Sequence, residues 1–144
     1  SGHHNSRRKR KSSRGCEISM PIIKTPLYDL PGDRYVVQTS ATSTPDNAVA
    51  GGAGILLQVD IDNTANTDAV YVKLYNHASP TVGGGGATAP EWVFKCPASV
   101  RRIFSCTPGS VFATNLSLAC VTTGGTAGTT SPTNAVTVRL LLDV

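Results

Sequence analysis

The stretch AVYVKLYN, residues 69–76, decides the fold class, because its apolar side chains recur at every second position. Alternation at a period of two is typical of a β-strand with one face in a core. We expect three residues of this strand to point inward, Val70, Val72 and Leu74, and three to point outward, Tyr71, Lys73 and Tyr75.

Six further runs have strand character: residues 34–40, 54–61, 91–96, 99–106, 111–121 and 135–142. Glycine, proline, threonine and asparagine fill the segments between them, TPGS among these, and no segment has a helical period. Seven strands with such connections predict an all-β fold, an antiparallel β-sandwich of Greek-key or jelly-roll type. The expected inner face comprises Ile55, Leu57, Val59, Val70, Val72, Leu74, Leu116, Leu118, Val138 and Leu140.

Three connections have a more specific interpretation. The loops TVGGGGATAP and TTGGTAGTTSPTN are longer than hairpin turns, so we expect them to cross between sheets or to reach neighbouring molecules. The acids in and beside DNTANTD, residues 62–68, are expected to cap a turn through backbone hydrogen bonds. A calcium site would need more carboxylates at defined spacing.

The N-terminal part of the chain differs sharply in charge from the rest. Residues 1–19 hold six basic residues and one acid, a net charge of +5, whereas residues 20–144 have a net charge of −1. Residues 20–33 carry three prolines, which favour an extended linker. We therefore divide the chain into an extended basic and proline-rich arm and linker, residues 1–33, and a β-sandwich domain, residues 34–144.

The basic arm is the candidate partner-binding site, through Arg7, Arg8, Lys9, Arg10, Lys11 and Arg14. It could neutralise phosphates of RNA or DNA, act as a nuclear address, or lie in an acidic groove of a protein partner. A solvated tail without a partner is the alternative. Aromatic residues that would stack on bases are absent from residues 1–19, so nucleic acid is the less favoured partner.

Motifs of catalysis and cofactor binding are missing. The chain has no G-x-S-x-G, H-E-x-x-H or Walker sequence, and the run Gly83–Gly86 lacks the lysine and the strand–helix context of a phosphate loop. Its cysteines and histidines do not have zinc-site spacing. No apolar run approaches the roughly 20 residues that span a bilayer. We expect no enzyme activity, no catalytic residue, no cofactor, no metal and no membrane contact.

Three segments carry a resemblance to a known class of proteins: VYVKLYNHASPTVG (70–83), APEWVFKCPA (89–98) and VFATNLSLACVTTGGTAGTTSPTNAVTVRLLLDV (111–144). They resemble small virion structural proteins of tailed bacteriophages, including head-decoration and cement proteins, over roughly residues 53–144. The resemblance implies a non-enzymatic capsid decoration protein that clamps neighbouring capsid subunits. Its partners would be the major capsid protein and copies of itself, as a homo-oligomer at the capsid surface or neck. The basic arm and the four cysteines depart from this class, so head, neck and tail positions stay open.

Two alternatives remain from the same observations. A coat protein of a small RNA virus would place the basic arm on packaged RNA, although a body of about 110 residues is short for a jelly roll that tiles a shell. A neck or tail module that binds a receptor or carbohydrate would need Tyr71, Tyr75 and Trp92 to converge on one exposed surface.

The four cysteines form no C-x-x-C pair. Cys16 lies between the basic arm and the proline-rich linker, where local sequence cannot bury it. Because virus particles persist outside the reducing cytosol, we hypothesise that Cys16 forms an inter-subunit disulfide, with a free thiol as the alternative. Cys96, Cys106 and Cys120 either act as small buried apolar residues or leave one internal pair and one odd thiol.

Overall fold

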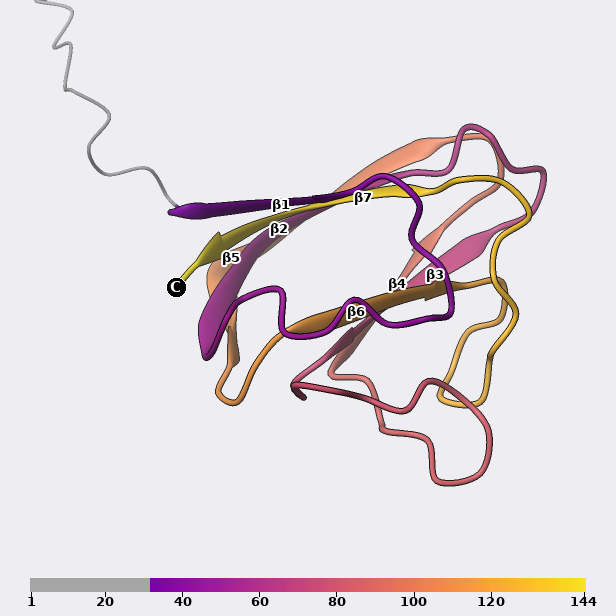
Figure 1. Cartoon of the computed structure of the whole chain (residues 1–144). Helices are drawn as coiled ribbons and strands as arrows, with labels where there is room; N and C mark the ends of the chain where they lie inside the picture. Colours follow the sequence, from indigo (N-terminus) through magenta and orange to yellow (C-terminus); the bar gives the residue numbers. More distant parts are fainter. Residues whose placement is uncertain (1–31) are drawn as a thin grey trace, which may run out of the picture.

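The computed structural model describes residues 32–144, and residues 1–31 lie outside this part. The described residues form seven strands and no helix (Figure 1). The strands are β1 (Arg34–Gln38), β2 (Gly54–Asp62), β3 (Val70–Tyr75), β4 (Trp92–Cys96), β5 (Arg101–Phe112), β6 (Ser117–Val121) and β7 (Thr137–Asp143). The predicted all-β class is confirmed, and five of the seven predicted runs match single strands apart from shifts at their ends; the boundaries of β5 and β6 differ from the runs 99–106 and 111–121.

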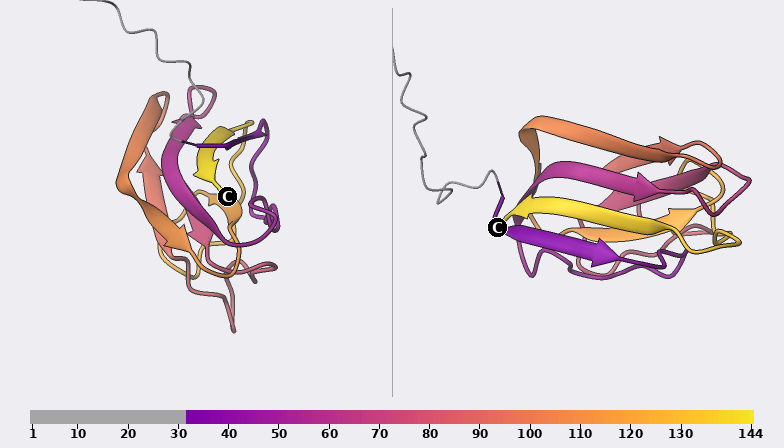
Figure 2. Two further views of the ribbon diagram at one scale, coloured as in Figure 1. Left: turned by 90° about the vertical axis from the view of Figure 1, so that its left-hand side faces the viewer. Right: turned by 90° about the horizontal axis from the view of Figure 1, so that it is seen from above.

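The strands form two antiparallel sheets that pack face to face (Figure 2). The large sheet has the order β1-β7-β2-β5, and the small sheet has the order β4-β3-β6. Asp46 adds a short bridge at the edge of the small sheet, where its N–H donates to the Leu118 carbonyl at 2.8 Å and its carbonyl accepts from the Leu118 N–H at 3.1 Å.

The pairing order defines a jelly roll. β1 pairs with β7, the segment around Asp46 with β6, β2 with β5, and β3 with β4. The chain thus pairs like one long hairpin that has been rolled into a sandwich, which is the arrangement of two Greek keys in a jelly roll. Residues 32–144 complete this pairing, so the small size of the body does not prevent it.

Inward-facing apolar residues of both sheets fill the core. Eight of the ten predicted inner-face residues are buried: Val59, Val70, Val72, Leu74, Leu116, Leu118, Val138 and Leu140. The prediction is wrong for Ile55 and Leu57, which are only half-buried, whereas Leu56 and Ile61 are fully buried. The register shifts between Leu56 and Gln58, and this irregularity reverses the alternation on the N-terminal side.

The same irregularity changes the expected strand boundaries. TPGS does not connect two strands but lies inside β5, where residues 106–109 loop out between the pairs Gln58↔Ser105 and Leu56↔Ser110. Gly109, with φ of +131°, adopts a backbone conformation that favours glycine at this point. The predicted strand 111–121 is consequently split between the end of β5 and β6.

The two long loops behave differently. Residues 76–91 join β3 to its neighbour β4 within the small sheet, so a crossing between sheets, one of the two expected roles, is wrong for this loop; a contact with neighbouring molecules stays a prediction. Residues 122–136 do cross from β6 in the small sheet to β7 in the large sheet.

Two of the three residues of β3 that were expected to be exposed on the outer face are buried. Lys73 and Tyr75 are fully buried instead of exposed. Loop 122–136 crosses the outer face of the small sheet and covers Lys73. The Lys73 ammonium donates to the carbonyls of Gly128 at 3.1 Å and of Thr126 at 3.4 Å. Burial lowers the pKa of Lys73 and raises that of Tyr75, since both charged forms lose solvation.

A buried asparagine pair joins three loops at one end of the sandwich. The Asn63 amide donates to the carbonyls of Asp68 and Pro97, both at 2.9 Å, and its side-chain oxygen accepts from Asn66 at 3.0 Å. Asn66 in turn accepts from the Asn134 N–H at 2.7 Å. These bonds fix the DNTANTD turn against the β4–β5 connection and the segment before β7.

Candidate interaction surface

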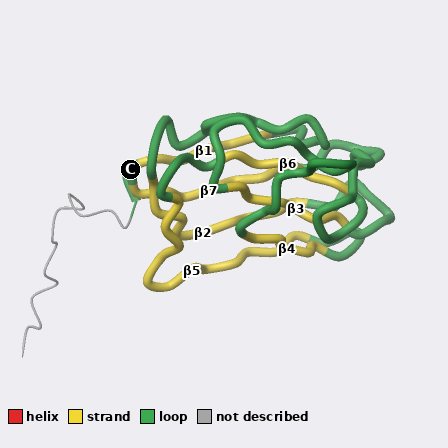
Figure 3. Tube along the Cα trace, turned by 90° about the horizontal axis from the view of Figure 1, so that it is seen from below, coloured by secondary structure: helices red, strands yellow, loops and turns green. Residues whose placement is uncertain are grey.

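The outer faces of the two sheets differ in their covering. Loops cross the outer side of the small sheet (Figure 3), where Gly124 lies against the Tyr71 ring and Gly83 lies against Thr129. The large sheet presents its four strands side by side without a loop over them (Figure 2). Among the described residues, the large sheet is therefore the face that is open to a partner.

Apolar side chains gather on this bare face. The exposed fraction is 63 % for Tyr35, 47 % for Val37, 56 % for Ile103 and 64 % for Val111. Half-buried Ile55, Leu57 and Leu141 lie on the same side, at register positions between them. We call this set the bare sheet face. Polar residues, among them Gln58, Asp60 and Arg139, lie between these apolar residues across the sheet. Exposed apolar side chains at several positions of one uncovered face make it a candidate interaction surface.

A charged group stands at the centre of the bare sheet face. The Asp60 carboxylate is only 6 % exposed and accepts two hydrogen bonds from Arg101, one of them from Nε at 2.8 Å. This bonding raises the pKa of the Arg101 guanidinium. Arg139 Nη1 lies 3.9 Å from the same carboxylate and is buried without a hydrogen-bond partner. Two guanidinium groups therefore flank the Asp60 carboxylate on this face.

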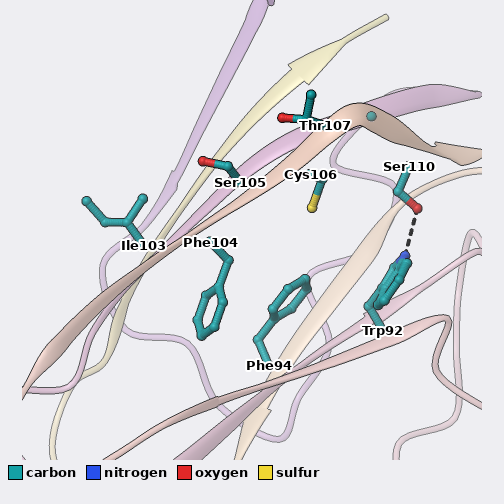
Figure 4. A pocket seen from close by; sticks show the side chains of 9 residues that line it. Trp92, Phe94, Ile103, Phe104, Ser105, Cys106, Thr107 and Ser110 are labelled. Atoms are coloured by element: carbon teal, nitrogen blue, oxygen red, sulfur yellow. Dashed lines mark hydrogen bonds between the residues drawn. The ribbon is translucent and has the colours of Figure 1, made fainter.

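An aromatic groove opens beside the bare sheet face, between the edge strands β4 and β5 (Figure 4). It has a volume of about 520 Å³, and its lining includes Trp92, Phe94, Phe104, Cys106 and Ser110. The rings of Trp92 and Phe94 stack at a centroid distance of 6.2 Å, and those of Phe94 and Phe104 approach to 5.0 Å. Trp92 Nε1 donates to Ser110 Oγ at 2.7 Å across the groove.

The predicted arm joins the body at one end of the large sheet. The Asp33 N–H donates to the Leu142 carbonyl at 2.9 Å, and the Asp33 carboxylate accepts from the Val144 N–H at 2.9 Å. The predicted arm residues Arg7, Arg8, Lys9, Arg10, Lys11 and Arg14 lie outside the described residues, as does Cys16. Their partners stay predictions.

The three described cysteines are free thiols, so the internal pair considered above does not form. Cys96 and Cys120 are buried, as expected for small apolar residues, and Cys106 is half-buried. Burial raises the pKa of each thiol, to about 12 for Cys120.

The remaining expectations concern ions, membranes and sugars. Asp62 caps the DNTANTD turn as predicted, because its Oδ1 accepts from the Thr64 N–H at 3.1 Å and hydroxyl at 2.6 Å, and these bonds lower its pKa. Residues 32–144 hold no cluster of three or more metal-ligating side chains and no helix long and apolar enough to span a membrane. Since Tyr75 is buried, the three aromatic residues of the carbohydrate hypothesis do not share an exposed surface.

Sequence reasoning missed both the groove and the bare sheet face. The alternating Trp92 and Phe94 of EWVFKC, together with Phe104 of RRIFSC, were a usable signal, since edge strands of two packed sheets can place such residues opposite each other. No protein-family model matches the chain, and no curated protein matches it either.

Proposed function

We propose that this chain is a non-enzymatic structural protein of a virus particle, which docks as a capsid decoration or cement subunit and clamps neighbouring capsid subunits. The asymmetry of the sandwich carries the proposal: loops close the small sheet, while the large sheet is bare and apolar. The basic arm joins at an end of that bare sheet. A docked body and a tethered arm would form two linked contacts, which hold more tightly than either alone.

The resemblance to small phage virion proteins supports the same class of function. On such a particle, the exposed apolar residues would supply contact area, and the charged group of Asp60, Arg101 and Arg139 would orient the subunit. The major capsid protein is the proposed partner, together with further copies of this chain.

The test is rebinding of the purified full chain to particles from which it has been stripped. Ile103→Lys places a charge on the bare sheet face at an exposed position, and should weaken attachment without unfolding the body. Ala78→Lys is the matched control on an exposed loop of the small-sheet side. Deleting residues 1–14 should also weaken attachment, most strongly at low salt, where charges are least screened. Unchanged attachment of both the Ile103→Lys and the deletion variants would refute the proposal.

A second candidate, a coat protein with an RNA-bound arm, is favoured by two observations. The pairing order is that of a jelly roll, an architecture that recurs in viral capsids. The described body offers another copy's arm little net negative charge, because the seven acidic residues of 32–144 are nearly balanced by six basic ones, and Asp60 and Asp62 lie beside Arg101 and Arg139. Six closely spaced positive charges would therefore find a better partner in a polyanion.

Self-assembly separates the two candidates. Purified full chain mixed with RNA should form closed shells visible by electron microscopy if it is a coat protein, and RNA affinity should fall steeply with salt. A decoration protein should remain a small oligomer and bind only preformed particles.

A further inference from the structure

We propose that the aromatic groove between β4 and β5 is the docking site of residues 20–31, MPIIKTPLYDLP, of the same chain. In this arrangement the proline-rich segment folds back across one end of the large sheet and lies in the groove of its own molecule. The inference concerns one molecule alone, so it does not depend on the virion role.

The groove offers apolar surface that the described residues leave open. The rings of Trp92, Phe94 and Phe104 form a continuous aromatic wall (Figure 4). The volume of about 520 Å³ lies within the range of sites that enclose a ligand. Trp92 is still 46 % exposed, and Ile103 is an exposed part of the same lining. The groove therefore suits an apolar occupant.

The chain enters the body at the end of the sandwich where the groove begins. Strand pairing runs in one row across the large sheet, from Arg34 through Leu142 and Leu56 to Ser110. Ser110 Oγ accepts the Trp92 indole N–H at 2.7 Å, so the far end of this row is the start of the groove. The row spans three strand spacings, or about 14 Å.

An apolar hollow lies along this route. It has a volume of about 340 Å³, and its lining includes Ile55, Val111 and Val144. Val111 and Val144 are both exposed. The Asp33 carboxylate accepts from the Val144 N–H, so the chain enters the body directly beside the hollow. A segment that crosses from Asp33 to the groove therefore meets apolar surface on the way.

The length of the segment matches the path. The groove follows β5 from Ser110, opposite Leu56, to Ile103, opposite Asp60, a distance of four residues or about 13 Å. Twelve extended residues reach about 40 Å. The crossing and the groove together take roughly 27 Å of this length. The remainder allows the chain to turn around the edge of β5.

Residues 20–31 have the matching chemistry. Pro21, Pro26 and Pro31 favour the polyproline conformation, which costs little entropy to fix and which aromatic grooves recognise. The same segment supplies the apolar side chains of Ile22, Ile23, Leu27, Tyr28 and Leu30. Because prolines lack an N–H, ring stacking and apolar contact dominate over strand pairing in this docking.

Attachment at Asp33 favours the groove of the same molecule over that of a neighbour. A tethered segment that can reach its site is present there at an effective concentration on the order of a millimolar. A second copy supplies the segment only at the concentration of free protein, which is far lower in dilute solution. Exchange between copies is forced only when the tether is too short, and this tether exceeds its path. Docking moves the point from which residues 1–19 leave the body to the β4–β5 edge.

Disulfide trapping in the full chain tests this geometry. In a Cys16→Ser background, the two variants Thr25→Cys and Leu27→Cys each place a thiol about 26 or 20 Å of extended chain before Asp33, near native Cys106 of the groove. Oxidised glutathione accepts the two electrons and two protons of the thiol pair and is released as two thiols. The reaction is run at alkaline pH because burial raises the pKa of Cys106.

We expect an internally cross-linked monomer, lighter by two hydrogen atoms, from at least one of the two variants. Proteolysis should release the segment and the Cys106 peptide as one disulfide-linked pair. Cross-linked dimers in place of this monomer would overturn the assignment to the same molecule. The absence of any cross-link to Cys106 in both variants would overturn the groove as the docking site.

The matched control moves the body thiol out of the groove at the same end of the sandwich. Ala113, which follows β5, is exposed and does not line the groove. The control therefore combines Cys106→Ser and Ala113→Cys with the same segment thiols. A segment without a fixed site would react with this exposed thiol at least as fast as with half-buried Cys106. Cross-linking should instead be much slower in the control, and equal rates would refute the proposal.

Fluorescence gives a second readout that needs no added thiol. Trp92 is the single tryptophan of the chain, so its emission reports directly on the groove. Leu27→Asp should shift the emission to longer wavelength, because a charged segment leaves the indole open to water. Ser13→Asp, the same charge change outside residues 20–31, should not. The native emission should be independent of protein concentration. A shift on dilution would indicate a second copy as the donor, and an emission that Leu27→Asp leaves unchanged would contradict the docking.

Discussion

Replacing Asn63 by alanine tests whether the buried asparagine pair holds one end of the sandwich together. Asn63 is fully buried, and its side chain makes three well-formed hydrogen bonds of 2.9 to 3.0 Å. Asn63→Ala leaves the Asp68 and Pro97 carbonyls and the Asn66 amide without these partners. An unsatisfied buried polar group costs about 1–3 kcal/mol.

The expected loss is therefore about 3–4 kcal/mol, since some of the freed groups can turn toward water. Such a loss is a large share of the roughly 5–15 kcal/mol that stabilises a typical domain. It corresponds to a decrease in Tm of roughly 10–20 °C. The measurement is urea and thermal unfolding of the full chain, followed by circular dichroism and by Trp92 emission.

Asn47→Ala is the matched control, because Asn47 is exposed and makes only one long contact, 3.4 Å to Ser79. It should change the free energy of unfolding by less than about 0.5 kcal/mol. The reasoning fails if Asn63→Ala costs less than about 1 kcal/mol, or if both variants lose the same amount.

Three further predictions concern stability. Lys73→Met tests the lowered pKa of Lys73. Because the unfolded chain binds the Lys73 proton more tightly than the folded chain, the free energy of unfolding of the native protein should rise relative to that of the variant as the pH increases toward 10.5. A difference between the two proteins that does not depend on pH would contradict this. Leu74→Ala should cost about 2–5 kcal/mol in chemical unfolding, whereas Leu57→Ala, at the half-buried bulge position, should cost roughly 1 kcal/mol. Gly83→Ala should lower the Tm more than Gly84→Ala. Both glycines have positive φ, but only at Gly83 would the added Cβ collide with a neighbour, the Thr129 methyl group, so equal shifts in Tm would exclude this contact as the cause.

The alternation of apolar residues predicts the inner face of this sandwich well, because burial against the opposite sheet is what selects Val70, Val72 and Leu74. It fails for the outward side of β3, where Lys73 lies under a loop that begins almost fifty residues later in the chain. The alternation of residues within one strand cannot show that a loop from a distant part of the sequence covers that strand. It fails again at Leu57, since one extra residue in the ladder reverses the face of the residues before it.

The candidate interaction surface was still harder to predict. Phe94 and Phe104 come from different sheets, and only the jelly-roll pairing brings their rings to 5.0 Å. Ile55 was expected on the inner face, and only the register shift between Leu56 and Gln58 places it beside Val111 on the bare sheet face. The net charge of a segment, by contrast, can be read from the sequence without the structure, and it was sufficient to predict the basic arm.

The position of β7 in the large sheet has a consequence for synthesis. Among the strands of residues 32–144, β1 pairs only with β7, which follows it by about a hundred residues, and β7 also lies between β1 and β2. While the ribosome is still making the chain, β1 has no backbone partner, and the sheet cannot close until β7 has emerged. Pairings between such distant segments form slowly. A nascent chain interrupted before residue 137 would expose its apolar strands to chaperones and proteases, and only chains extended through β7 could enter an assembly that requires the large sheet.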